Sequence, residues 1–178
     1  SETVKLFNGK LLDFMGIALP KYRGGAHYTW QILSNNKSGA CNLQIIYGGK
    51  KSFHKGEIIK RSEYLFPESA RIPQDYFNFA IRKETLFLAE FLNEVHEEKN
   101  FSLESLDESI SSYYPFLNTK IQGWINWNWS AEEIDRFICA FDDPYDGAST
   151  YLSESRVYLK DCEIVEKEEN FHPFHSGL

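Results

Sequence analysis

The clearest chemical pattern in this chain is the string LPKYRGGA at residues 19–26. A largely apolar run over residues 11–19 enters a proline, a basic–aromatic triplet and two glycines, and a helix-like segment follows. Glycine lets the backbone turn sharply and approach another group closely. Arg23 carries a fork of N–H donors, which can bind an anionic group or pair with a carboxylate that fixes the loop. The string therefore predicts a binding loop that follows a buried strand.

The elements that must position this loop follow from the apolar patterns along the first half of the chain. Residues 11–19, 40–47 and 57–66 predict strands, and residues 28–33 predict a short helix. A long helix is expected to begin at Pro73, which suits a first-turn position. The apolar face expected for this helix consists of Phe77, Ala80, Ile81, Leu88, Phe91, Leu92 and Val95.

The second half of the chain predicts a connection, a capped helix and a β-rich end. Residues 101–123 are typical of a surface connection, and SAEE at residues 130–133 is a capping-box signature. Strands are expected at 156–159 and 162–165. The tryptophans within residues 124–129 fit either an aromatic ligand platform or a packed strand under the capped helix.

Composition limits the class of protein. The 178 residues are 42% hydrophobic and 25% charged, as in globular proteins, and the net charge of −7 argues against a broad nucleic-acid face. The three cysteines are widely spaced and match neither a disulfide framework nor zinc spacing, which favours a reducing cytoplasm. The sequence shows no long apolar span or signal-peptide pattern. His172 and His175 offer only two metal ligands with Pro173 between them, so no metal site is predicted.

Two segments resemble the formyltransferases that use 10-formyltetrahydrofolate, which include methionyl-tRNA and sugar-nucleotide enzymes. Residues 19–30 are similar to the LPxYRGxxPxxW loop of that family, and residues 125–148 resemble the junction at its C-terminal boundary. The resemblance implies an α/β fold, with the second half of a Rossmann-like formyltransferase sheet followed by the start of a small β-rich C-terminal module. It also implies a missing first half, so that another copy or another chain is expected to cover the surface near residues 6–12.

The resemblance divides the chain into four parts. These are a formyltransferase-like core at residues 1–100, a connection at 101–123, a boundary segment and helix at 124–148, and the β-rich module at 149–178. In the family, the glycine loop borders the place where the formyl donor meets the acceptor amine. The residues that the resemblance places at the substrate and the donor are Met15, Pro20, Tyr22, Arg23, Gly24 and Gly25.

Catalysis in that family depends on an asparagine, a histidine and an aspartate. The aligned residues here are Asp13, Met15 and His54, so none of the three positions keeps the family residue. One interpretation is a rewired site, in which Asp13 and His54 form an acid–base pair and His27 adds a second imidazole. The other is a catalytically silent relative, because methionine cannot act as an acid or a base and loop histidines are often simple surface residues.

The function that the resemblance implies is transfer of a formyl group from 10-formyltetrahydrofolate to an amine. The expected acceptor is a nucleotide-linked amino sugar or another small molecule rather than initiator tRNA, because the basic content is low. Two alternatives stay open: a silent binding or regulatory module, and a hydrolase that acts on a formyl group through an activated water. A dimer or a second chain is expected as partner, and neither nucleic acid nor membrane.

Overall fold

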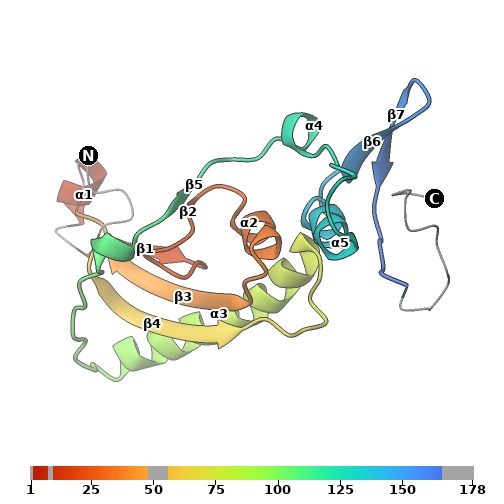
Figure 1. The fold of residues 1–178 in the computed structure, drawn as a ribbon. Helices are drawn as coiled ribbons and strands as arrows, with labels where there is room; N and C mark the ends of the chain where they lie inside the picture. Colours follow the sequence, from red (N-terminus) through yellow and green to blue (C-terminus); the bar gives the residue numbers. More distant parts are fainter. Residues whose placement is uncertain (1, 8–9, 48–55, 166–178) are drawn as a thin grey trace. The chain divides into compact units, whose positions relative to one another are not determined.

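The computed structural model describes residues 2–7, 10–47 and 56–165, and these belong to two units (Figure 1). The first unit comprises Ser1–His27, Lys37–Pro67 and Asn78–Pro115, and the second comprises Tyr28–Asn36, Glu68–Phe77 and Phe116–Leu178. In chain order the elements are α1 (Glu2–Leu6), β1 (Leu12–Met15), β2 (Arg23–Gly24), α2 (His27–Leu33), β3 (Ser38–Ile45), β4 (Ile58–Leu65), α3 (Pro73–His96), η1 (Glu108–Ile110), β5 (Tyr113–Tyr114), α4 (Thr119–Gln122), α5 (Ala131–Ala140), β6 (Ala148–Leu152) and β7 (Ser155–Leu159).

The first unit is built on a three-stranded antiparallel sheet in the order β1-β3-β4. The register of β1 on β3 runs from Leu12 opposite Ile45 to Met15 opposite Asn42. The prediction that the first two strand segments share one sheet is therefore confirmed. Within the described part of the chain, β1 pairs with no strand besides β3.

Both faces of the central strand β3 are buried, including the two amide side chains Asn42 and Gln44. Successive side chains of a strand point to opposite faces, so Cys41 and Leu43 lie on one face of β3 and Asn42 and Gln44 lie on the other. The cluster that includes α3 residues consists of Cys41, Leu43, Phe87 and Phe91. A second cluster consists of Ile17, Leu19 and Ile58, with Met15 and Leu106 packed against it.

The predicted strand at residues 11–19 is longer than the observed one. β1 ends at Met15, and the backbone then turns, with the Leu19 N–H donating to the Ile17 carbonyl at 2.8 Å. The apolar residues after Met15 are buried without being in a strand, which periodicity alone does not distinguish. The other strands and the short helix of this half lie close to their predicted bounds.

α3 begins at Pro73 as predicted, but its buried face is narrower than the expected one. Ala80, Phe87 and Phe91 are buried. Four residues of the expected face are exposed: Phe77, Ile81, Leu92 and Val95. The physical reason is that the helix rests on the sheet through one stripe at spacings of about seven and four residues, and the apolar residues on both sides of that stripe face outward.

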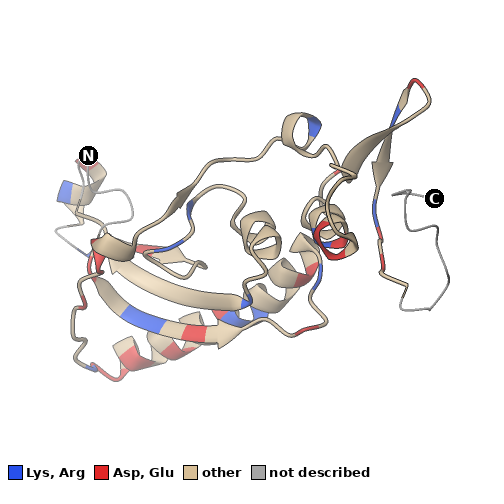
Figure 2. Ribbon diagram, in the orientation of Figure 1, with Lys and Arg blue, Asp and Glu red and all other residues tan. Residues whose placement is uncertain are grey.

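An ion pair ties α3 to β4 beside this stripe. The Lys60 Nζ atom lies 2.7 Å from the Glu94 carboxylate, and Lys99 lies 2.6 Å from the same carboxylate. These two ammonium groups hold the pKa of Glu94 below its usual range. Figure 2 shows basic residues on β4 beside acidic residues on α3.

Residues 101–115 are largely exposed, as expected for a connection, but they also return to the sheet and the loop. Glu104 exchanges two main-chain hydrogen bonds with Ile58, at 2.8 and 2.9 Å. β5 then pairs in parallel with β2, as Figure 1 shows. The connection is therefore also part of the scaffold around the loop.

The second unit contains α5 and a hairpin formed by β6 and β7. The predicted capping box is confirmed, because the Glu133 N–H donates to the Ser130 hydroxyl and the Ser130 N–H donates to the Glu133 carboxylate. The strand predicted at 162–165 is wrong, and the partner of β7 is β6 instead.

The tryptophans of residues 124–129 pack within the second unit, but they do not form a strand. Trp124 stacks on Tyr151 with ring centroids 4.8 Å apart and forms an isolated bridge with Ser149. The Trp127 indole N–H donates to Thr150 at 2.8 Å. A turn after Asn126 interrupts the alternating pattern, which explains why the predicted strand is absent.

Candidate functional site

The loop after β1 lies against residues 107–115, a segment that we call the strap. Gly24 has a φ of +112°, and a Cβ atom at that position would lie 2.0 Å from the main-chain oxygen of Tyr114. The N–H of Gly25 donates to that same oxygen at 3.1 Å. The two glycines thus permit the close backbone approach that the sequence predicted, and the group approached is the strap.

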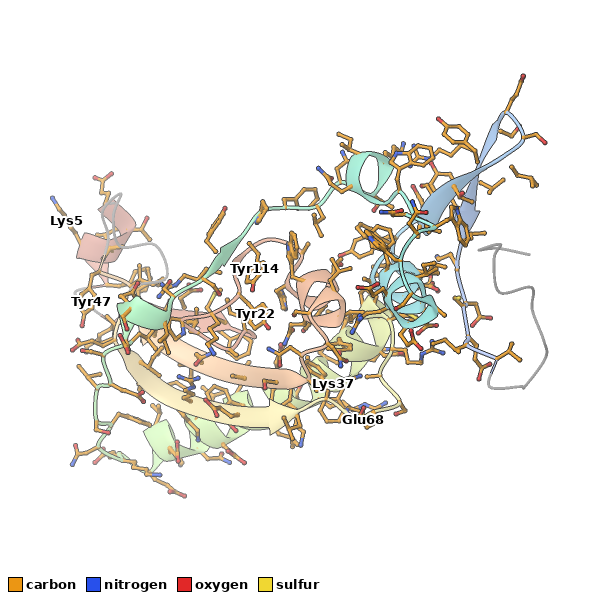
Figure 3. All side chains as sticks on the ribbon, viewed as in Figure 1. Lys5, Tyr22, Lys37, Tyr47, Glu68 and Tyr114 are labelled. Atoms are coloured by element: carbon orange, nitrogen blue, oxygen red, sulfur yellow. The ribbon has the colours of Figure 1, made fainter. Side chains whose placement is uncertain are left out.

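Main-chain contacts and one ring pair hold the first part of the loop. The Arg23 N–H donates to the Ser112 carbonyl at 3.1 Å, and the Ser112 N–H donates to the Pro20 carbonyl at 3.3 Å. The Tyr22 N–H donates to the Ser112 hydroxyl at 3.1 Å. The rings of Tyr22 and Tyr114 stack with centroids 5.2 Å apart, and Figure 3 labels both residues. The strap therefore fixes Tyr22 at a φ of 59°, a left-handed conformation that non-glycine residues rarely adopt.

The guanidinium of Arg23 is buried and engaged by the strap. Its two terminal nitrogens donate to the two carboxylate oxygens of Glu108, each at 2.8 Å, and Nη1 also donates to the Ser111 hydroxyl at 2.6 Å. This is the forked pairing that arginine makes with carboxylates. Of the two roles predicted for Arg23, the structure therefore shows the loop-fixing one.

Asp13 and Met15 share one face of β1, because they are two residues apart. Asp13 lies opposite Gln44 in the register, and Met15 lies opposite Asn42. Asp13 is partly buried, and Met15 packs against the cluster of Ile17, Leu19 and Ile58. The carboxylate is thus next to an amide on the neighbouring strand, while the methionine contributes to packing.

Of the two histidines of the predicted site, His27 lies within the described residues. His27 is the first residue of α2 and is partly buried, and burial lowers its pKa to about 4. Its imidazole is therefore neutral at pH 7 and cannot donate a proton as an imidazolium. His54 lies outside the described residues.

Other catalytic chemistries find little support among the described residues. Within residues 2–7, 10–47 and 56–165, no group of three or more His, Cys, Asp or Glu side chains is arranged to hold a metal ion. Burial raises the pKa of Cys41 to about 12 and that of Cys139 to about 11, so both thiols are protonated at neutral pH. In the described part of the chain, no helix has both the length and the apolar character needed to cross a membrane.

Sequence reasoning missed the polar residues that hold the site together. They are Asn42, Gln44, Glu108, Ser111, Ser112 and Tyr114. Two amides inside an otherwise apolar run were a usable signal for Asn42 and Gln44, because a buried polar side chain normally has a hydrogen-bonding task. The strap residues carry no such signal, because their partners lie about 90 residues earlier in the chain.

Known proteins similar to this chain are formyltransferases. Residues 118–177 match the family described as "Formyl transferase, C-terminal domain". A methionyl-tRNA formyltransferase of Clostridium tetani (strain Massachusetts / E88) is 27% identical over 156 residues, which cover 87% of this chain and 48% of that protein. The N-formyltransferase from Helicobacter canadensis, solved with folinic acid and dTDP-3-aminofucose, is 26% identical with a TM-score of 0.58, over 75% of this chain and 48% of that one. A 4-N formyltransferase from Francisella tularensis shares the fold, with a TM-score of 0.67 and 17% identity over 90% of this chain and 66% of that one.

The chain has an α/β fold that it shares with solved formyltransferases, as the resemblance implied. Residues 118–177 match the C-terminal domain of the formyltransferase family, and the chain is similar to formyltransferases over most of its length. It spans about half the length of the curated relatives that it matches, at 48% and 46% of their residues.

Proposed function

We propose that this chain takes part in transfer of a formyl group from 10-formyltetrahydrofolate to the amine of a nucleotide-linked amino sugar. The observation that carries this proposal is the fixed loop: Tyr22 to Gly25 are held by the strap directly after the strand that bears Asp13. Transfer between two bound molecules requires such a preorganised boundary, because correct positioning supplies much of the rate. A loop of a purely structural protein has no such requirement.

The acceptor class is supported by one relative and by the charge of the chain. The Helicobacter canadensis enzyme, at 26% identity, was solved with folinic acid and dTDP-3-aminofucose. The chain has a net charge of −7, which disfavours tRNA as the acceptor because phosphate binding draws on clustered Lys and Arg. The Clostridium tetani relative is named for methionyl-tRNA, so initiator tRNA remains the competing acceptor to be tested.

The proposed reaction moves a formyl group from the folate donor to an acceptor amine. The donor supplies the formyl carbon: a new C–N bond to the amine forms, the bond from N10 to that carbon breaks, the amine loses a proton and N10 gains one. We assign acceptance of the amine proton to the Asp13 carboxylate and donation to N10 to the His54 imidazole. His27, neutral at pH 7, is assigned hydrogen bonding only.

The silent binding module remains a second candidate because of Met15. Its side chain packs on the apolar cluster of Ile17, Leu19 and Ile58, at the position where the family carries its imidazole. Such packing fits a protein that has kept the scaffold and lost the acid–base group. A silent module would bind a folate without transferring its formyl group.

The experiment is an acceptor screen with the natural protein. It is incubated with 10-formyltetrahydrofolate and, separately, a dTDP-3-amino sugar, a dTDP-4-amino sugar and initiator methionyl-tRNA. Tetrahydrofolate release and the mass of the formylated product are measured, and folate binding is measured by calorimetry. Formylation of an amino sugar supports the proposal; formylation of the tRNA alone contradicts the acceptor class. Folate binding without any transfer supports the silent module.

A further inference from the structure

Two cysteines that are far apart in the sequence contact the same arginine in the second unit. The Arg71 Nη2 atom donates to the Cys139 Sγ atom at 3.5 Å and to the Cys162 carbonyl at 3.0 Å. The same nitrogen lies 2.6 Å from the carboxylate of Asp135, which is one helical turn before Cys139 on α5. One atom of Arg71 therefore touches both cysteines, and this places the two residues side by side.

The segment that carries Cys162 is fixed to the end of α5. The Asp161 N–H donates to the Asp142 carboxylate at 2.7 Å, and the Lys160 ammonium lies 3.8 Å from the same carboxylate. Asp142 is 4% exposed and directly follows the C-cap of α5. Two cysteines can be joined without distortion only where their main chains already lie close together. These contacts hold the main chain at Cys162 beside α5, which is the arrangement that a disulfide requires.

The two thiols differ in their access to solvent. Cys139 is buried, whereas Cys162 is partly exposed, so a dissolved oxidant reaches Cys162 first. Burial raises the pKa of both thiols, that of Cys139 to about 11, and the Asp135 carboxylate raises both further. The Cys162 thiol and Asp142 also raise the pKa of Cys139, while the Arg71 guanidinium lowers the pKa of each thiol. Thiolates are therefore rare at neutral pH, and oxidation of this pair is faster at higher pH.

We infer that Cys139 and Cys162 form a reversible disulfide, which joins α5 to the segment after β7. The oxidant is a low-molecular-weight disulfide such as glutathione disulfide. The Cys162 thiolate attacks one sulfur of this oxidant, so that a mixed disulfide forms and one glutathione thiolate leaves. The Cys139 thiolate then attacks the Cys162 sulfur, and the second glutathione thiolate leaves. In total the two cysteines lose two electrons and two protons, and the two glutathione molecules gain them.

The crosslink encloses the β6–β7 hairpin, because both strands lie between the two cysteines in the sequence. A disulfide stabilises a protein mainly by restricting the unfolded chain that it closes into a loop. Oxidation is therefore expected to hold the hairpin and α5 together more firmly, and reduction to release them. This effect does not depend on formyl transfer.

The test exposes the natural protein to buffers of defined glutathione to glutathione disulfide ratio. The wild type, Cys139→Ser, Cys162→Ser and Cys41→Ser are equilibrated at about pH 8, where thiol exchange is faster. Cys41→Ser is the matched control, because Cys41 is a buried thiol on β3 in the first unit. Free thiols are then blocked, and peptides are mapped by mass with and without dithiothreitol. Amide hydrogen exchange is compared between the reduced and the oxidised wild type.

The expected result is a specific and reversible crosslink. In oxidising buffer, the wild type and Cys41→Ser should give a linked peptide that contains Cys139 and Cys162, and dithiothreitol should separate it. Cys139→Ser should keep glutathione on Cys162, because the second attack is missing, and Cys162→Ser should stay reduced, because Cys139 is buried. Oxidation of the wild type should slow exchange in α5 and the β6–β7 hairpin about tenfold and leave β3 unchanged.

The inference is overturned if the wild type stays reduced at every glutathione ratio, or if glutathione remains on Cys162 and no linked peptide forms. A crosslink that involves Cys41, or one that joins two molecules into a dimer on a non-reducing gel, also contradicts it. If either serine variant of the pair fails to fold, the peptide map of the wild type alone decides which thiols are joined.

Discussion

The loop at residues 19–26 and the strand β1 before it differ in how far they keep the formyltransferase pattern. The loop keeps LP, YRG and the tryptophan of the family string, with His27 at the position of its second proline, whereas the resemblance aligns Asp13 and Met15 of β1 with an amide and an imidazole. The loop is constrained through its backbone: Gly24 lies against the Tyr114 carbonyl, and Arg23 is held by Glu108. β1 is constrained through its hydrogen-bonded register with β3, which tolerates many side chains.

This difference shows which positions of a site tolerate substitution. A backbone position with positive φ, or with another main-chain group within contact distance, accepts glycine and little else. A partly buried strand position accepts any side chain that its face can accommodate. Chemistry can therefore change on β1 while the loop keeps its form, and the proposed roles of Asp13 and His54 depend on this separation.

The largest expected effect comes from removal of the proposed acid–base pair. We expect His54→Ala to lower kcat about a hundredfold or more with folate affinity little changed, because the imidazole acts in the chemical step. Asp13→Asn, which keeps the shape and removes the charge, should give a loss of similar size. His96→Ala is the control, since His96 is exposed at the end of α3. Wild-type rates in both site variants would show that the chemistry lies elsewhere.

Two glycine substitutions test whether the loop is constrained through its backbone. Gly24→Ala should lower the free energy of unfolding by about 3 kcal/mol, because φ is +112° and the new Cβ meets main-chain atoms of the strap. Gly16→Ala should cost less than about 1 kcal/mol, since the atom in its way is the carboxylate of the flexible Glu84 side chain. Urea unfolding measures both values. Equal costs would contradict the backbone account of the loop.

The next effect is a dependence of stability on pH. Burial lowers the pKa of His27 from 6.5 to about 4, so the unfolded chain takes up the proton more readily as pH falls below 6.5. The stabilisation is complete above that value and is lost as pH falls toward the folded pKa. We expect the wild type to lose about 2 kcal/mol of unfolding free energy between about pH 7 and pH 4.5 that His27→Gln keeps. The same slope in both proteins would mean that His27 is not buried as described.

The smallest expected effect tests how much the pairing of Glu108 with Arg23 helps the strap to hold the loop. Glu108→Gln keeps the shape and removes the charge that faces Arg23. Because the Glu108 side chain is 43% exposed, water screens the pair, and we expect a loss of about 1 kcal/mol. Hydrogen exchange should increase in residues 20–25 and 107–115 and remain unchanged in α5. Unchanged exchange in the loop would show that the main-chain bonds alone hold it.

Sequence patterns predicted the elements better than the contacts between them. Local signals gave the glycine loop, the capping box at Ser130 and the start of α3 at Pro73, because each depends on neighbouring residues. The face of α3 was predicted only in part, since its amphipathic pattern is broader than the stripe that the sheet covers. The pairing of Arg23 with Glu108 depends on residues 85 apart, and no local pattern indicates it.

The part of the candidate site that could be predicted is the loop, because its sequence resembles a family string. Tyr22, Arg23 and Gly24 lie in a tight loop as predicted, and Arg23 pairs with a carboxylate of the same chain. Their predicted contact with substrate or donor stays a prediction. The roles of Asn42 and Gln44 could not be read from the run at residues 40–47. Their hydrogen bonds go to main-chain carbonyls of other segments, which periodicity does not reveal.

Chemical rescue tests the proposal that His54 supplies the imidazole which β1 lacks. His54→Ala is assayed for formyl transfer with increasing concentrations of free imidazole, and His96→Ala serves as the reference. We expect the rate of His54→Ala to start about a hundredfold or more below that of the wild type and to rise with imidazole concentration, while the rate of His96→Ala does not respond. A rate for His54→Ala that stays low at every imidazole concentration, or that equals the wild-type rate without any imidazole, would contradict it.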